Sequence, residues 1–110
     1  EGLKDVKGIR CLPQTANRTR NHSYFPILVE ADYPLSRDAL YQELKDNGIN
    51  GRRYFYPLIS DFSMYRGLAS ALPSNLPVAI SAANKVICLP IYPALNAEDQ
   101  KRVIDLIAKF

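Results

Sequence analysis

The sequence predicts an α+β domain in which helices pack on one face of a small sheet that is mixed or mostly antiparallel. Short segments rich in β-branched and aromatic residues predict the strands, and segments with helical periodicity lie between and after them. The expected order is β-β-α-β-α-β-α. The chain has 110 residues, so folding buries about 65% of the surface of the unfolded chain, enough for one hydrophobic core. We therefore expect a single domain over residues 1–110.

Two strands are expected before the first long helix. Residues 1–8 are polar with spaced apolar positions, which predicts the frayed end of a helix leading into a strand over residues 9–12. Residues 24–30 are apolar on both faces and predict a strand near the middle of the domain. Pro26 has no N–H to donate, which favours an edge or a bulge at its own position. Residues 13–22 show no periodicity and predict a loop.

The next helix has clear start and stop signals. Ser36 is a good N-cap for a helix over residues 37–47, and Gly48 takes the left-handed conformation after the helix end at no steric cost. A strand is expected over residues 52–56, and residues 60–72 are irregular.

Two further helices enclose the last strand, which spans residues 86–89. The first begins with Ser74 or Asn75 as its cap and Pro77 in its first turn. Its apolar stripe is suited to packing on a sheet and consists of Val78, Ala79, Ala82, Ala83 and Val86. The final helix is capped by Asn96, with Asp99 at the third helical position. Its stripe consists of Val103, Leu106, Ile107 and Phe110.

Composition excludes several classes of function. The net charge is +3, with 14 Lys and Arg interspersed among 11 acids, and the one basic concentration, residues 17–22, predicts a solvated loop. We therefore expect no nucleic-acid partner. No apolar run approaches the roughly 20 residues of a membrane span, and residues 1–4 are no signal peptide, so we expect a cytoplasmic protein with no membrane partner.

The residues themselves predict neither a metal site nor a catalytic constellation. Cys11 and Cys88 are far apart in apolar surroundings and are expected to be free thiols, with a disulfide between them left open. One histidine, His22, lies in a loop beside arginines, where a surface position explains it. Zinc would need more ligands than these three residues supply.

The aromatic and basic segment 52–56 is the best candidate site. In a strand, Arg52, Tyr54 and Tyr56 would share one face, while Arg53 and Phe55 would share the other. Tyrosine combines a flat apolar body with a hydroxyl, which suits the wall of a sugar or nucleotide pocket. Two alternatives remain: Phe55 and one tyrosine are core with solvated arginines, or the segment stacks single-stranded nucleic acid.

Several runs in register resemble one enzyme family. They are residues 23–27 (SYFPI), 48–58 (GINGRRYFYPL) with Tyr65 and Arg66 after it, 76–79 (LPVA) and 86–93 (VICLPIYP). Together they resemble the C-terminal small domain of the DegT–StrS family, the PLP-dependent sugar-nucleotide aminotransferases of fold type I. The resemblance covers residues 8–110.

The resemblance implies an enzyme whose centre lies elsewhere. Members are bacterial PLP enzymes, usually homodimers, that transfer an amino group from glutamate or glutamine to a keto sugar on dTDP or UDP, for surface polysaccharide or modified-sugar synthesis. This chain would then be the C-terminal domain of a longer protein, without the PLP-binding large domain. None of its lysines sits in a matching motif. It would supply no catalytic residue, bind no PLP and be inactive alone.

The resemblance also implies which residues meet the substrate. Tyr54 and Tyr56, and then Arg53, are expected to form part of the substrate wall. Many members carry a histidine at or near Phe55 or at residues 59–60, and this chain has none there. Two other functions stay open: a stand-alone binding module of this fold, and a domain of a PLP-type sugar dehydratase.

Overall fold

The computed structural model describes residues 1–13, 16–17, 19, 21–54 and 56–110. It confirms the α+β class, with a three-stranded antiparallel sheet in the order β1-β2-β3. Three short 3₁₀ turns stand between the first and second helices. The elements are β1 (Ile9–Cys11), β2 (Phe25–Val29), α1 (Arg37–Asp46), η1 (Ile59–Asp61), η2 (Ala69–Ala71), η3 (Pro73–Asn75), α2 (Pro77–Lys85), β3 (Val86–Leu89) and α3 (Ala97–Ala108).

The strand expected near the middle of the domain, β2, is the central strand of the sheet. Ile27 lies opposite Cys11 of β1 on one side and Ile87 of β3 on the other. β1 ends opposite Ile27, and the next residue of β2, Pro26, is paired with Cys88 of β3. Pro26 therefore has a neighbouring strand on one side only. This position suits a residue that has no N–H to donate.

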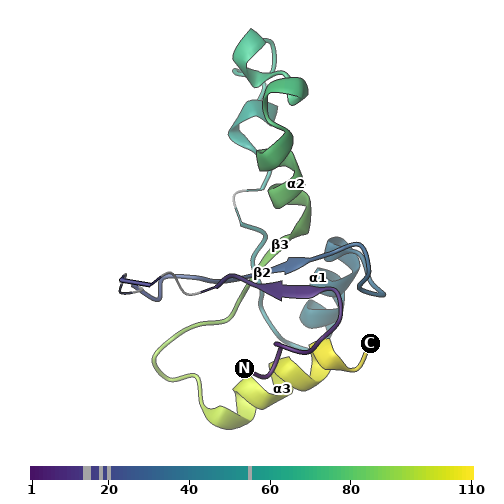
Figure 1. Ribbon diagram of the computed structural model, residues 1–110, viewed down its shortest axis with the longest axis vertical. Coiled ribbons are helices and arrows are strands. Elements are labelled where there is room, and N and C mark those ends of the chain that lie inside the picture. The colour runs from purple at the N-terminus through teal and green to yellow at the C-terminus, as the bar shows by residue number, and fades with distance from the viewer. Residues whose placement is uncertain (14–15, 18, 20, 55) are drawn as a thin grey trace.

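One face of the sheet forms the hydrophobic core with α1 and α3. Residues directly opposite each other in neighbouring strands point to the same face. Figure 1 shows α3 beneath the sheet, with α2 leaving on the other side. The buried core cluster includes Val103 and Ile107 of the stripe expected on α3, whereas Phe110 of that stripe is exposed. The cluster comprises Leu3, Ile9, Ile27, Val29, Tyr33, Leu40, Leu44, Ile49, Ile87, Leu89, Val103 and Ile107.

The predicted caps of α1 and α3 are confirmed. The Ser36 hydroxyl accepts a hydrogen bond from the Ala39 N–H at 3.2 Å, and the Asn96 amide oxygen accepts one from the Asp99 N–H at 2.7 Å. Gly48 has φ +73°, the left-handed conformation expected after the end of α1.

The cysteines are both free, Cys88 buried and Cys11 half-buried. Cys11 shares a face with Ile27 and Ile87, because the three lie opposite one another across the sheet. Cys88 follows Ile87 and so points to the other face. The sheet itself therefore separates the two thiols.

The strand expected over residues 52–56 was wrong. In the described part of this segment the pairing is a single bridge, Arg52 with Cys88, and Phe55 lies outside the described residues. The next antiparallel pair would join Tyr54 to Val86. The Val86 N–H instead donates to the Ala82 carbonyl at the end of α2, and the Val86 carbonyl accepts from the Arg37 guanidinium at 3.5 Å. The N–H and the carbonyl of Val86 are therefore both engaged elsewhere, and strand pairing does not continue from Arg52 to Tyr54.

Two expected helix ends were also wrong. Residues 1–8 form hydrogen-bonded turns, such as Lys4 N–H to the Glu1 carbonyl, in place of a frayed helix. Neither Ser74 nor Asn75 caps α2, because both lie in η3 and the Asn75 amide donates to the Ala69 carbonyl at 2.8 Å. The first helical position of α2 is Pro77, as expected.

The expected packing of α2 on the sheet holds only at the C-terminal end of the stripe, where α2 contacts β2 and Ala83 and Val86 are buried. Val78 in the predicted stripe is 81% exposed, and Ala83 alone is buried among the described residues of α2. Figure 1 shows α2 and the 3₁₀ turns projecting from the body. We call residues 57–85 the arm. The radius of gyration is 15.6 Å, against about 13 Å for a compact chain of this length.

Tyr33 ties the core to the C-terminal helix and provides a test by pH. It is buried, and its hydroxyl donates to the Ile107 carbonyl at 2.7 Å. Burial raises the pKa of Tyr33 to about 12, from 10.0 in the unfolded chain. Between these values the unfolded state loses its proton first, so stability falls as pH rises through the window and is unaffected below it.

We expect the free energy of unfolding of the wild-type chain to fall by about 2 kcal/mol more than that of Tyr33→Phe between pH 10 and 12. Urea unfolding at a series of pH values measures the difference. Parallel profiles for the two proteins would contradict the buried phenol.

Candidate functional site

The candidate segment begins where the chain crosses from α1 to the edge of β3. Arg52 and Cys88 exchange two backbone hydrogen bonds, of 2.9 and 2.7 Å. Gly51 allows this approach, since a Cβ there would lie 3.2 Å from Ile87 Cγ2 and 3.4 Å from the Cys88 carbonyl oxygen. The bridge fixes where residues 53–56 leave the sheet.

The three predicted substrate residues lie in two groups. Tyr54 packs edge-on against Tyr24, with ring centroids 5.0 Å apart. Arg53 instead joins Tyr56, with its guanidinium carbon 4.9 Å from that ring centroid. The expected shared face of Tyr54 and Tyr56, with Arg53 opposite, was therefore wrong, because the segment does not continue as a strand after Arg52.

Arg53 and Tyr56 belong to a ladder of alternating rings and guanidinium groups. The Arg53 guanidinium also lies 4.8 Å from the Tyr41 ring centroid, and the Arg37 guanidinium lies 4.8 Å from that of Tyr56. We call Arg37, Tyr41, Arg53 and Tyr56 the Arg–Tyr cluster. Each contact is within the range in which a cation is attracted to an aromatic face. The sequence interpretation missed Arg37 and Tyr41, although both stand one turn apart on α1.

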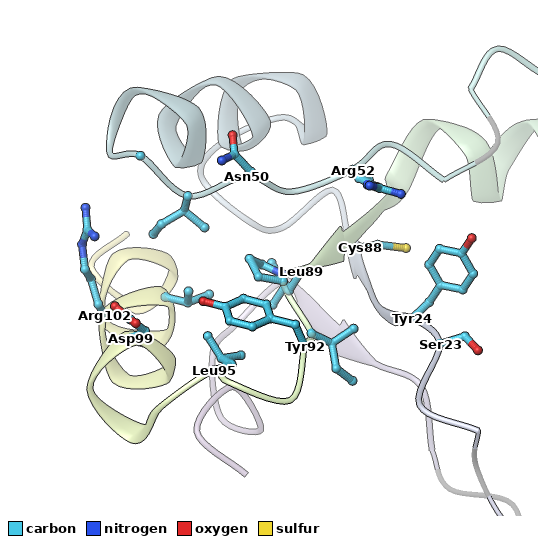
Figure 2. Close-up of a pocket in the computed structure, with 15 residues that line it drawn as sticks. Ser23, Tyr24, Asn50, Arg52, Cys88, Leu89, Tyr92, Leu95, Asp99 and Arg102 are labelled. Atoms are coloured by element: carbon cyan, nitrogen blue, oxygen red, sulfur yellow. The ribbon is translucent and has the colours of Figure 1, made fainter.

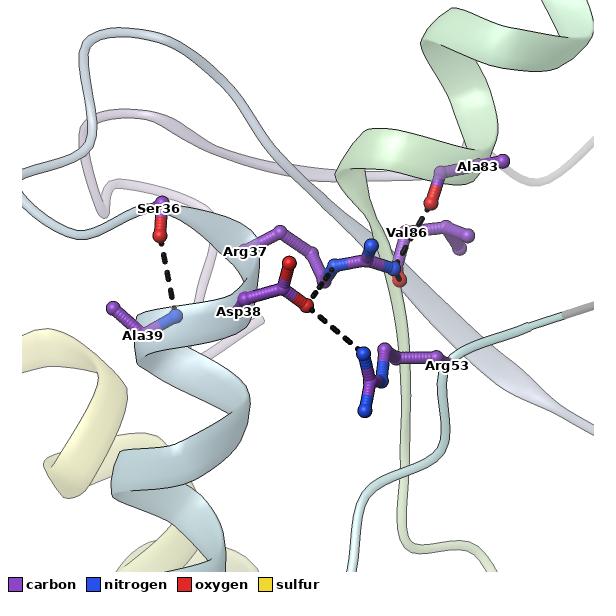
Figure 3. Close-up of polar contacts among 7 residues, drawn as sticks. All are labelled: Ser36, Arg37, Asp38, Ala39, Arg53, Ala83 and Val86. Carbon is purple, nitrogen blue, oxygen red and sulfur yellow. Dashed lines mark hydrogen bonds and ion pairs between the residues drawn. The ribbon is translucent and has the colours of Figure 1, made fainter. Parts of the chain in front are cut away.

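Arg37 is the buried member of the cluster, with 5% of its surface exposed. Figure 3 shows its side chain reaching from α1 to the end of α2, where it donates to the Ala83 carbonyl at 2.9 Å. Its Nε lies 2.9 Å from Asp38 Oδ1 without hydrogen-bond geometry. Arg37 therefore joins the arm to the body and supports the Tyr56 ring.

The cluster has an excess of positive charge. Asp38 is the carboxylate for both guanidinium groups, at 2.9 Å from Arg37 and 3.4 Å from Arg53. Asp38 is largely exposed, while Tyr56 is 48% exposed and Arg53 about one-third exposed. The Tyr56 side chain and the Arg53 guanidinium, which contact each other, are thus both partly open to solvent, which suits an anionic ligand.

A pocket of about 450 Å³ lies on the other side of Arg52, a size in the range of small-molecule sites. Figure 2 shows Tyr92 at its centre, Tyr24 at one end, and Asp99 and Arg102 on α3 at the other. The sequence interpretation treated Asp99 as a cap and did not single out Arg102 or Tyr92. The pocket depends on the fold, because its walls come from three separate segments.

Cys88 borders this pocket but is not a reactive thiol. Burial raises its pKa, against a smaller opposing effect of Arg52, so the thiolate is disfavoured near neutral pH. The described parts of the chain contain no cluster of three metal-ligating side chains. Within the same residues, no helix has the length and apolar character needed to cross a bilayer.

Comparison with known proteins decides the family. The profile of the DegT/DnrJ/EryC1/StrS aminotransferase family matches residues 1–108. The chain belongs to this family. The resemblance of the motif runs is thereby confirmed over nearly the whole chain.

Two of the relatives are sugar transaminases. The dTDP-4-amino-4,6-dideoxy-D-glucose transaminases of Escherichia coli and Shigella dysenteriae are 50% and 41% identical over 105 residues, 96% of this chain and 28% of each relative. Among solved structures, DesI in the presence of its TDP-sugar product superposes with a TM-score of 0.83 at 28% identity, over 98% of this chain and 27% of that one. The chain thus spans little more than a quarter of these relatives.

The residues of this family member do not compose a PLP site. PLP enzymes hold the cofactor as a Schiff base with a lysine. Lys85, Lys101 and Lys109 each contact a carboxylate, on Glu30, Asp105 and Glu43, at 2.5–2.7 Å. Lys4, Lys7 and Lys45 are exposed, and none of them lines the pocket of Figure 2 or joins the Arg–Tyr cluster. Neither the pocket of Figure 2 nor the Arg–Tyr cluster therefore offers a lysine for a Schiff base.

Proposed function

We propose that this chain is the C-terminal domain of a PLP-dependent aminotransferase that acts at carbon 4 of a dTDP-linked 6-deoxy sugar. The observation that carries the proposal is its high identity to two transaminases named for that sugar. Because the chain spans 28% of each, the activity belongs to a larger protein. The remaining segment would hold PLP, which receives and returns the amino group, and this domain would be inactive alone.

The Arg–Tyr cluster supports a role for this domain in the substrate wall. A nucleotide-linked sugar combines a diphosphate, a hydroxyl-rich ring and a base. Arg53 offers charge for the diphosphate, and the half-exposed Tyr56 offers a phenol for hydroxyls. Tyr54, packed on Tyr24, would extend the wall toward the pocket of Figure 2. We further propose that the complete enzyme is a cytoplasmic homodimer using glutamate or glutamine as donor, in surface polysaccharide synthesis.

We expect Tyr56→Phe or Arg53→Ala in the complete enzyme to raise the KM for the nucleotide sugar about tenfold, the effect of losing one hydrogen bond or charge contact. PLP absorbance should be unchanged, because neither residue meets the cofactor. Steady-state kinetics measure the first quantity and absorbance titration the second.

Two matched controls separate this role from general damage. Tyr65→Phe removes a phenol on the arm, and Arg10→Ala removes a guanidinium paired with Glu30 on the sheet. Both should retain the wild-type KM. If Tyr56→Phe and Arg53→Ala behave like these controls, the cluster is not part of the wall.

The activity itself is tested on the complete product of the gene that encodes this segment. The purified protein is incubated with dTDP-4-amino-4,6-dideoxyglucose and 2-oxoglutarate, and a second sample is reduced with borohydride for peptide mass spectrometry. We expect glutamate and a 4-keto sugar, and a phosphopyridoxyl-lysine outside residues 1–110. No adduct, or an adduct on one of the six lysines of this chain, would overturn the proposal. A histidine in place of the cofactor lysine would indicate dehydratase chemistry.

A further inference from the structure

The arm presents apolar side chains that nothing in this chain covers. No described residue between 57 and 78 is buried. Met64 is 72% exposed and Val78 is 81% exposed, whereas scattered single apolar residues are the usual condition of a surface. The large exposed apolar residues of this stretch are Ile59, Phe62, Met64, Tyr65, Leu68, Leu72 and Val78.

The arm is also nearly free of charge. The arm contains three charged side chains, Asp61, Arg66 and Lys85, and Lys85, its last residue, pairs with Glu30 of the body. The Arg66 side chain is exposed, and its guanidinium donates to the Asp61 carbonyl at 2.8 and 3.2 Å. Solvent-facing surfaces carry about a quarter to a third of charged residues, while the buried centres of interfaces are depleted of charge and enriched in aromatic residues and methionine.

Local hydrogen bonds shape the arm. The Asp61 N–H donates to the Leu58 carbonyl at 2.9 Å, and the Asn75 amide holds the Ala69 carbonyl. Arg37 attaches the base of the arm to α1. The superposition with DesI covers 98% of this chain, so the same projecting shape recurs in a protein several times longer. An apolar projection of fixed shape in a larger protein requires a surface that receives it.

We propose that the arm is a docking surface for the segment of the same polypeptide that lies outside these 110 residues. The inference rests on the proposed function, which requires such a segment. A covalently attached partner is always present at high effective concentration, so it covers an apolar projection as soon as both parts fold. A second copy would leave the projection exposed at low concentration. The near absence of charge on the arm predicts an apolar, uncharged receiving surface.

Thiol labelling of the complete protein tests the docking. Met64→Cys places one thiol between η1 and η2, and Val78→Cys places one in the first turn of α2. Lys101→Cys is the control, because that side chain is 74% exposed on α3, outside the arm. The rate of reaction with iodoacetamide is read for each position by peptide mass spectrometry, which separates it from Cys11, Cys88 and other native thiols. We expect both arm positions to react at least tenfold more slowly than position 101.

The outcomes distinguish whether the rest of the polypeptide, a second copy or nothing covers the arm. Arm positions that react as fast as position 101 would overturn the docking, whatever the activity of the protein. Protection that disappears when the sample is diluted to monomers would assign the surface to a second copy and also overturn it. Protection that persists on dilution supports the proposal. Because labelling does not depend on turnover, an inactive but protected protein would reject the proposed function and leave the docking in place.

Discussion

Gly8→Ala is expected to destabilise the domain by about 3 kcal/mol, combining a left-handed backbone penalty with overpacking. Gly8 has φ +76°, and a Cβ there would lie 2.2 Å from the Tyr33 backbone nitrogen and 2.5 Å from its Cα. These atoms are held close because the Glu30 N–H donates to the Gly8 carbonyl at 2.8 Å. Neither backbone can retreat without breaking the start of β1. Urea unfolding of the 110-residue chain gives the difference.

Gly67→Ala is the matched control. Gly67 lies on the arm with an ordinary φ, and a Cβ there would meet nothing within 4 Å. We expect its free energy of unfolding to stay within about 0.5 kcal/mol of wild type, as for an exposed position. Similar values for the two variants would mean that Gly8 and Tyr33 are not held in this close approach.

The sequence predicted those parts of the fold that local chemistry determines. Ser36 and Asn96 cap their helices because a side-chain oxygen three residues before an N–H reaches it in any helix start. Ile107 in the apolar stripe of α3 is fully buried, because a 3.6-residue period places it on the inward face. The family motifs could also be recognised from the sequence alone, since each is a continuous run of residues.

The errors came from competition between segments far apart in the chain. Residues 52–56 have the composition of a strand, but strand pairing needs free donors and acceptors on the neighbour. The backbone of Val86 is occupied by Ala82 and Arg37. The stripe on α2 has the periodicity of a packed helix, but periodicity does not state what it packs on. For α2 the fitting surface lies outside this chain if the arm docks as proposed.

In the candidate site, too, the local features could be predicted from the sequence and the contacts between distant segments could not. Arg53, Tyr54 and Tyr56 could be selected from composition, because arginine and tyrosine together suit an anionic ring-bearing ligand. Composition could not show that Tyr54 packs on Tyr24 and that Arg53 packs on Tyr41, because neither partner is near in sequence. The pocket of Figure 2 was missed for the same reason.

Arg37→Met is expected to destabilise the 110-residue chain by about 2–3 kcal/mol. Methionine keeps much of the length and apolar volume of the side chain but donates no hydrogen bond. The Ala83 carbonyl would lose its 2.9 Å bond to the guanidinium, and an unsatisfied buried acceptor costs about 1–3 kcal/mol. The contact with the Tyr56 ring, 4.8 Å away, would lose its cationic part, worth about 0.5–1 kcal/mol. Urea unfolding measures the sum.

Arg53→Met tests whether the loss of stability in Arg37→Met arises because Arg37 is buried. Arg53 is about one-third exposed and lies 3.4 Å from the same Asp38 carboxylate, so its loss should cost less than about 1 kcal/mol. The loss of stability in Arg37→Lys should lie between those of Arg37→Met and Arg53→Met. An ammonium group retains the charge but lacks the planar fork that reaches both α2 and the ring. If the complete protein acts on a nucleotide sugar as proposed, Arg37→Lys should also raise the KM for that sugar with kcat little changed, since Arg37 contacts the Tyr56 ring. Equal losses of stability for Arg37→Met and Arg53→Met would show that the buried guanidinium does not join the arm to the body.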